Sequence, residues 1–231
     1  MSGQSSAQTA APRVALIHAT ALAMAPIQSA FSRHWPQARC MNLLDDSLSV
    51  DLAQAGQLMP AMVQRFVDLA TYAKGTGCSA ILFTCSAFGP AIEAAGAAVG
   101  LPTLKPNEAM FDDALRLCPD GGRVGLIATC EASIPSMSAE LQAMADRQGR
   151  DIGLQTRFVP GAMQDLAEGR AEEHHQKIAK AAQELADCTV VMLAQFSMAA
   201  AQPLTQAGLS CPVLSSPDCA VLSLQKRMQH V

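Results

Sequence analysis

The sequence of 231 residues matches itself when it is shifted by 110 residues. Three separate blocks obey this shift, whereas the match fades between about residues 21 and 77. A constant shift over well-separated blocks indicates a duplicated unit. The aligned blocks are RVALIHAT (13–20) with RVGLIATC (123–130), CSAI (78–81) with CTVV (188–191), and PTL (102–104) with PVL (212–214). The chain is therefore expected to contain one structural unit twice.

Each copy alternates short apolar runs with longer amphipathic stretches, which is the pattern of βαβ units with parallel strands. We predict an α/β fold of two pseudo-symmetric duplicated lobes, each a short parallel sheet flanked by helices, with the active site in the cleft between them. Residues 1–12 should form a flexible tail, 13–116 the first lobe and 117–216 the second, with a C-terminal helix at 217–228 able to pack on the first lobe. The predicted strands lie near 13–18, 38–43, 79–84, 101–104, 122–128, 153–159, 188–194 and 211–214. The predicted helices lie near 50–74, 88–99, 106–117, 132–148, 161–186, 198–207 and 217–228.

Polar residues follow several of the predicted strands, where open parallel sheets bind their ligands. If the two copies face each other, the segments after corresponding strands surround one cleft. The candidate site residues selected in this way are His18, Thr20, Thr84, Cys85, Ser86, Thr129, Cys130, Ser133, Gln195 and Ser197. Specificity is expected to come from loops near 19–30, 44–50 and 159–170.

Cys85 is the strongest candidate for a reactive group. It follows an apolar strand and precedes a helix that begins with small residues. Backbone amides and the positive end of a helix dipole stabilise a thiolate, so we expect a lowered pKa for Cys85. The chain has 8 cysteines with no CxxC pair and no zinc-type spacing, and the others are interpreted as reduced core thiols.

The segments around Cys85 and Thr129 resemble the aspartate/glutamate/hydantoin racemase superfamily, which also includes arylmalonate decarboxylase and maleate isomerase. Thr84-Cys85-Ser86 is similar to the site at which the first domain of these enzymes supplies a catalytic cysteine. VGLIATCEASIPSMSAEL (124–141) is similar to the family segment that begins VGLLAT. The resemblance implies that Thr129 and Ser133, together with Ser136, bind a substrate carboxylate and that the reaction needs no cofactor.

The second half departs from the family pattern at Gln195. The repeat places Gln195 opposite Cys85, where the family carries its second cysteine. A carboxamide cannot exchange a proton near neutral pH, whereas two-base racemisation needs an acid or base on each face of the substrate. Three alternatives stay open: Cys130 as a second thiol, His18 as a base, or a reaction that needs one thiol only.

The leading hypothesis is a cofactor-independent racemase or isomerase of a small carboxylic acid, amino-acid or hydantoin-like. Cys85 would carry the proton or act as the nucleophile, and Ser86, Thr129 and Ser133 would bind the carboxylate. Gln195 and Ser197 would orient the substrate or donate to an oxyanion. The alternatives are a lyase that resembles arylmalonate decarboxylase, a cis–trans isomerase that resembles maleate isomerase, and a non-catalytic protein that binds a small ligand in the same cleft.

Composition narrows the setting of this activity. The net charge is −4 and the basic residues are scattered, which argues against nucleic acid as a partner. The N-terminal residues lack an apolar signal region, and no apolar run approaches the roughly 20 residues of a membrane span, so we expect a cytoplasmic protein. The expected ligand is a small carboxylate substrate. The sequence does not decide between a monomer and a homodimer. Asn107 is interpreted as a helix cap, and the run 172–175 as a solvated helix face.

Overall fold

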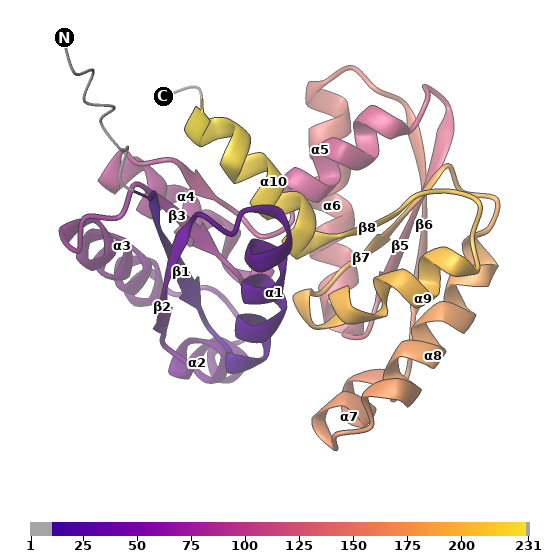
Figure 1. Ribbon diagram of the computed structural model, residues 1–231, viewed down its shortest axis with the longest axis horizontal. Helices are drawn as coiled ribbons and strands as arrows, with labels where there is room; N and C mark the ends of the chain where they lie inside the picture. The colour runs from indigo at the N-terminus through magenta and orange to yellow at the C-terminus, as the bar shows by residue number, and fades with distance from the viewer. Residues whose placement is uncertain (1–10, 230–231) are drawn as a thin grey trace, which may run out of the picture.

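The computed structural model describes residues 11–229 and contains two four-stranded sheets side by side (Figure 1). The strand order is β2-β1-β3-β4 in the first sheet and β6-β5-β7-β8 in the second, and every strand pair is parallel. The eight predicted strands are all present, so the α/β expectation is confirmed. Residues 1–10 of the predicted tail lie outside the described residues. The strands are β1 (Arg13–His18), β2 (Arg39–Leu44), β3 (Ala80–Phe83), β4 (Thr103–Leu104), β5 (Gly122–Ala128), β6 (Ile152–Phe158), β7 (Val190–Leu193) and β8 (Val213–Ser215).

The strand register reproduces the 110-residue repeat. Val14 lies opposite Ala80 in the first sheet, and Val124 lies opposite Val190 in the second. Equivalent strands therefore pair at equivalent residues. The two lobes are two copies of one sheet topology, as the sequence predicts.

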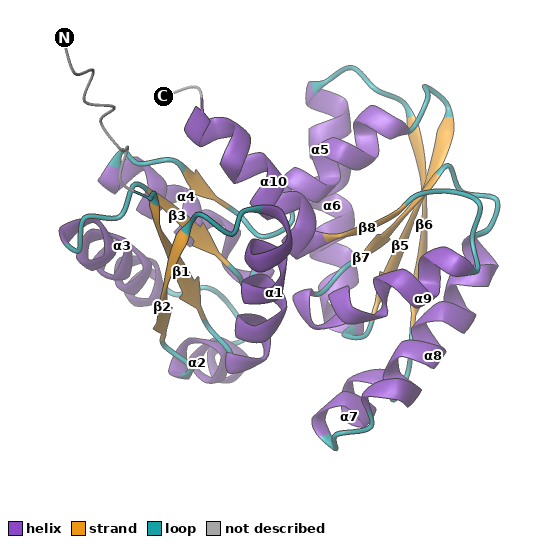
Figure 2. Ribbon diagram, viewed as in Figure 1, coloured by secondary structure: helices purple, strands orange, loops and turns teal. Residues whose placement is uncertain are grey.

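Helices cover both faces of each sheet (Figure 2). In the first lobe α3 and α4 cover one face, where the Phe66 ring stacks on Phe83 and lies tilted against Phe88, with ring centroids 5.2 and 4.8 Å apart. In the second lobe α6 lies on one face and α8 on the other. The helices are α1 (Met24–His34), α2 (Ser47–Ala55), α3 (Pro60–Gly75), α4 (Gly89–Val99), α5 (Glu108–Leu117), α6 (Ile134–Arg147), α7 (Ala162–Ala167), α8 (Ala171–Ala182), α9 (Gln202–Ala207) and α10 (Ser216–Gln229).

The two lobes exchange one helix each. Helix α5 follows the last strand of the first sheet, yet its buried Met110 and Phe111 pack with Leu126 in the core of the second lobe. Helix α10 follows the last strand of the second sheet, yet Val221 packs with Leu16 in the first lobe. The predicted boundary at 116 is therefore wrong for α5, because its apolar face is buried against the second sheet. Helices α1, α5 and α10 lie between the two sheets (Figure 1).

Three helical regions differ from the prediction. The helix predicted at 50–74 is two helices, because Gly56 ends α2 with a left-handed φ of 66° and Pro60 begins α3. The helix predicted at 161–186 is likewise broken after α7, where Gly169 has a φ of 80°. Residues 19–30, expected to be a loop, contain the start of α1, which buries Ile27, Ala30 and Phe31.

His174 in α8 is fully buried, so the prediction of a solvated face is wrong at this residue. Neither ring nitrogen has a hydrogen-bond partner in the described part of the chain. Burial, and secondarily the neighbouring His175, lowers the pKa of His174 to about 4, although the charge of Asp165 opposes this shift. The imidazole is therefore neutral in the folded protein at pH 7.

Replacing His174 by leucine is expected to flatten the pH dependence of stability. Between pH 6.5 and 4 the unfolded chain binds a proton at His174 that the folded chain does not, so the free energy of unfolding falls as the pH falls. The loss is at most about 3 kcal/mol, since each pKa unit corresponds to about 1.4 kcal/mol. Urea denaturation at pH 7 and pH 5 measures it. An equally steep loss in His174→Leu would contradict this assignment.

Candidate functional site

A cleft with a volume of about 140 Å³ lies where strand ends of both lobes meet. The first lobe contributes the segments after β1, β3 and β4, and the second lobe contributes the segment after β7. Helix α7 adds Met163. The cleft is lined by Thr20, Leu22, Ala23, Thr84, Cys85, Ser86, Pro106, Asn107, Met163, Ala194, Gln195, Phe196 and Ser197.

Six of the ten predicted site residues line this cleft, and four do not. Cys130 is exposed outside it, while Thr129 is buried with 4% of its surface accessible. Ser133 and His18 are also absent from the lining. The predicted residues that meet at the cleft are Thr20, Thr84, Cys85, Ser86, Gln195 and Ser197.

Cys85 is the one titratable side chain among the residues that line the cleft in the described chain. It lies between β3 and a short 3₁₀ turn, Ser86–Phe88, and the α-helix starts only at Gly89. Burial raises the pKa of the Cys85 thiol and outweighs the opposing effect of the Ala87 backbone amide. The predicted lowering of this pKa is therefore wrong, and the group is a neutral thiol at pH 7.

His18 supports the Cys85 segment from inside the protein. Its Nε2 lies 3.0 Å from Asn42 Oδ1, which can only accept, so Nε2 carries the hydrogen. Its Nδ1 then accepts from the Thr84 hydroxyl, 2.8 Å away. Burial lowers the pKa of His18 and keeps the ring neutral, although the Asn42 hydrogen bond opposes this shift. With no exposed surface and both nitrogens engaged, His18 orients Thr84 and does not reach a ligand in the cleft.

Gln195 connects the cleft to the residues that the family resemblance assigns to a carboxylate. Its Oε1 accepts from the Thr129 backbone amide at 2.9 Å and from the Thr129 hydroxyl at 3.2 Å. Its Nε2 donates to Ser133 Oγ at 2.8 Å. The Gln195 side chain thus occupies both donors of Thr129, a residue that does not itself line the cleft.

Asn107 lines the cleft, although the sequence predicts a helix cap at this residue. It precedes α5, but its side chain makes no capping hydrogen bond. Its Oδ1 instead accepts from the Ser216 hydroxyl, and its Nδ2 has no partner in the described chain. An unpaired buried amide donor is costly, and Asn107 lines the cleft, so we expect a small movement of this side chain to bring the donor to a ligand acceptor. The sequence signal was present, because Asn107 follows a strand end.

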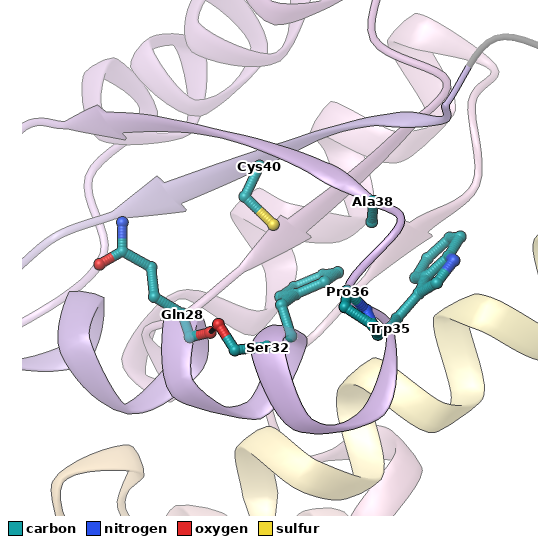
Figure 3. A pocket seen from close by; sticks show the side chains of 7 residues that line it. Gln28, Ser32, Trp35, Pro36, Ala38 and Cys40 are labelled. Atoms are coloured by element: carbon teal, nitrogen blue, oxygen red, sulfur yellow. Dashed lines mark hydrogen bonds between the residues drawn. The ribbon is translucent and has the colours of Figure 1, made fainter.

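A larger cavity of about 380 Å³ lies away from this site, between α1 and the edge strand β2 (Figure 3). It is lined by Gln28, Ser32, Trp35 and Cys40 among others, and by none of the predicted site residues. Burial raises the pKa of the Cys40 thiol to about 11, so this thiol is unreactive at neutral pH.

Within residues 11–229 no cluster of three or more His, Cys, Asp or Glu side chains is placed to hold a metal ion. Of the helices in this same range, none combines the length and apolar character that crossing a membrane requires.

Comparison with known proteins places this geometry among related folds. The model of the Asp/Glu/Hydantoin racemase family matches residues 14–224. No curated protein matches the sequence. Glutamate racemase from Bacillus anthracis superposes with a TM-score of 0.70 at 16% identity, covering 96% of this chain and 83% of that chain. Allantoin racemase from Klebsiella pneumoniae gives 0.69 at 14% identity, with 94% and 88% covered. An arylmalonate decarboxylase gives 0.61 at 16% identity, with 93% and 92% covered.

Proposed function

The chain belongs to the Asp/Glu/Hydantoin racemase family, and from this membership we propose that it is a cofactor-independent enzyme that moves one proton at the carbon next to the carboxylate of a small acid. Cys85 is the proposed proton carrier. The observation that supports this most directly is that Cys85 alone, among the described residues lining the cleft, can exchange a proton. Fold similarity by itself does not carry the assignment.

The arrangement favours a reaction that needs a single thiol. Two-base racemisation requires a second acid or base on the opposite face of the substrate. Gln195 faces the cleft from the other lobe, but its amide is not titratable and is held by Thr129 and Ser133. Cys130 is exposed and His18 is buried, so neither supplies the missing group.

The reaction that fits a neutral thiol best is protonation of an enediolate after loss of carbon dioxide. The bond to the leaving carboxylate breaks, its electron pair stays on the carbon, and the Cys85 S–H proton moves to that carbon. Water then returns a proton to the thiolate. Thr20 and Ser86 line the cleft, and their hydroxyls would donate to the retained carboxylate. The apolar Leu22, Met163 and Phe196 would disfavour a second charged group, which promotes its loss.

An isomerase is the second candidate, because the family is named for racemases and because the Ala87 amide opposes the raised pKa of Cys85. A thiolate formed there would remove an α-proton, or add to a double bond and leave after rotation. Both reactions need the deprotonated sulfur, which is scarce at pH 7 when burial raises the thiol pKa.

Incubation in deuterated water separates these reactions. With substituted malonates, the proposed lyase releases carbon dioxide and leaves one deuterium on the product carbon. With single enantiomers of amino acids or hydantoins, a racemase exchanges the α-proton without gas release. With maleate, a cis–trans isomerase forms fumarate. Absence of all three with a folded protein would contradict the proposed function and favour a ligand-binding role.

Replacing Asn107 by aspartate is expected to raise KM by about tenfold or more. Ser216 can still donate to the new carboxylate, so the local structure is retained, but the donor is lost and a like charge faces the substrate. Steady-state kinetics measures the change. Asn107→Ala removes the donor without adding charge, so its KM should lie between those of the wild type and Asn107→Asp. An unchanged KM in both variants would contradict a substrate contact at Asn107.

A further inference from the structure

The carboxamide of Gln195 is bound by its own protein as a ligand would be. The backbone N–H of Thr129 can only donate, which fixes Oε1 as the atom that faces it. The Thr129 hydroxyl donates to the same oxygen, and Ser133 accepts from Nε2 while donating to the Cys130 carbonyl at 2.7 Å. Every polar group in this network has a partner.

The same groups would suit a carboxylate. A backbone amide and a hydroxyl converging on one oxygen form charge-assisted hydrogen bonds with an anion. Ser133 could rotate its hydroxyl from the Cys130 carbonyl to the second oxygen. We call the Thr129 amide, the Thr129 hydroxyl and the Ser133 hydroxyl the Thr129 subsite. Gln195 lines the cleft and accepts from both Thr129 donors, whereas Thr129 is buried and does not line the cleft.

We propose that Gln195 is a specificity-determining residue whose carboxamide fills a carboxylate-binding subsite of the second lobe. The wild-type protein then holds one carboxylate, at the donors of the first lobe, and offers no anion site at Thr129. Shortening Gln195 opens the Thr129 subsite to the cleft. This inference rests on the proposed function for its ligand class, a carboxylate, but its test requires no turnover.

Acetate titration followed by the backbone amide resonance of Thr129 tests the proposal. In Gln195→Ala the Thr129 amide should shift on addition of acetate, with a Kd at least about tenfold lower than at the same resonance in the wild type, as expected for a gained charge-assisted hydrogen bond. Gln195→Glu keeps an acceptor in the subsite and should behave as a closed control. Gln28→Ala, in the separate cavity beside α1, should match the wild type.

Two results would overturn the proposal: an equal acetate response at Thr129 in the wild type, or no response in a folded Gln195→Ala protein. Either result leaves the role of Cys85 untouched, because binding at Thr129 does not involve the thiol. Conversely, if Cys85→Ala leaves turnover unchanged, the proposed function is contradicted. The acetate titration would still test the Thr129 subsite in that case. The two failures are therefore distinguishable.

Discussion

Replacing Cys85 by alanine is expected to lower kcat by roughly 10²- to 10⁴-fold, the range that a positioned acid or base contributes. The thiol is the one group lining the cleft, among described residues, that can deliver a proton, and alanine has none. Stability should change little, because Cys85 is only partly buried at the edge of the first core. Turnover and the thermal unfolding midpoint measured on the same sample separate the two effects.

The matched control is Cys40→Ala, which removes a half-buried thiol from the other cavity. This variant should keep the wild-type kcat. A Cys85→Ala enzyme with full activity would show that the cleft thiol does not carry the proton. Equal losses in both variants would point to general damage rather than to chemistry at Cys85.

Gln195→Cys is expected to create α-proton exchange that the wild type lacks. The repeat places residue 195 as the counterpart of Cys85, and both line the cleft from opposite lobes. A thiol there would supply the second titratable group that racemisation requires. The shorter side chain would also release the Thr129 donors for a substrate carboxylate. Loss of optical activity and deuterium incorporation at the α-carbon measure the gain.

Gln195→Ser separates these two consequences. Serine is as short as cysteine and frees the same donors, but its hydroxyl is too weak an acid to exchange protons at pH 7. Exchange that appears with cysteine and not with serine assigns the gain to the second thiol. Exchange with both variants would mean that opening the subsite suffices.

The repeat was sufficient to predict the sheets, because the shift preserves the pairing partners of the strands. The same shift also relates helices in the region where the sequence match fades. Helices α1 and α6 begin at Met24 and Ile134, which differ by the same 110 residues, and the buried Ile27 and Phe31 correspond to Met137 and Leu141. The residues of each pair are both buried but differ in type, so a comparison of residue identities could not detect the relation between these helices.

The site was predictable to the level of strand ends and not beyond. Cys85 and Gln195 were found because strand ends of both lobes meet at one cleft. The direction of the Cys85 pKa was wrong because local sequence shows the backbone amides near the sulfur but not the side chains that bury it. The enclosure of Thr129 by Gln195 joins residues 66 positions apart, and this contact depends on tertiary structure alone.

Because the two lobes exchange helices α5 and α10, the core of each lobe includes residues from the other half of the chain. A fragment ending before α10 would remove one of the two helices, α1 and α10, that pack on Val14 and Leu16 of the first sheet. A fragment starting after α5 would likewise remove one of the two helices, α5 and α6, that pack on Val124 and Leu126. Exposing such surfaces is unfavourable by roughly 25 cal/mol per Å² of apolar area. Each half is therefore expected to be destabilised when isolated, and the protein is expected to unfold in one cooperative transition despite its duplicated architecture.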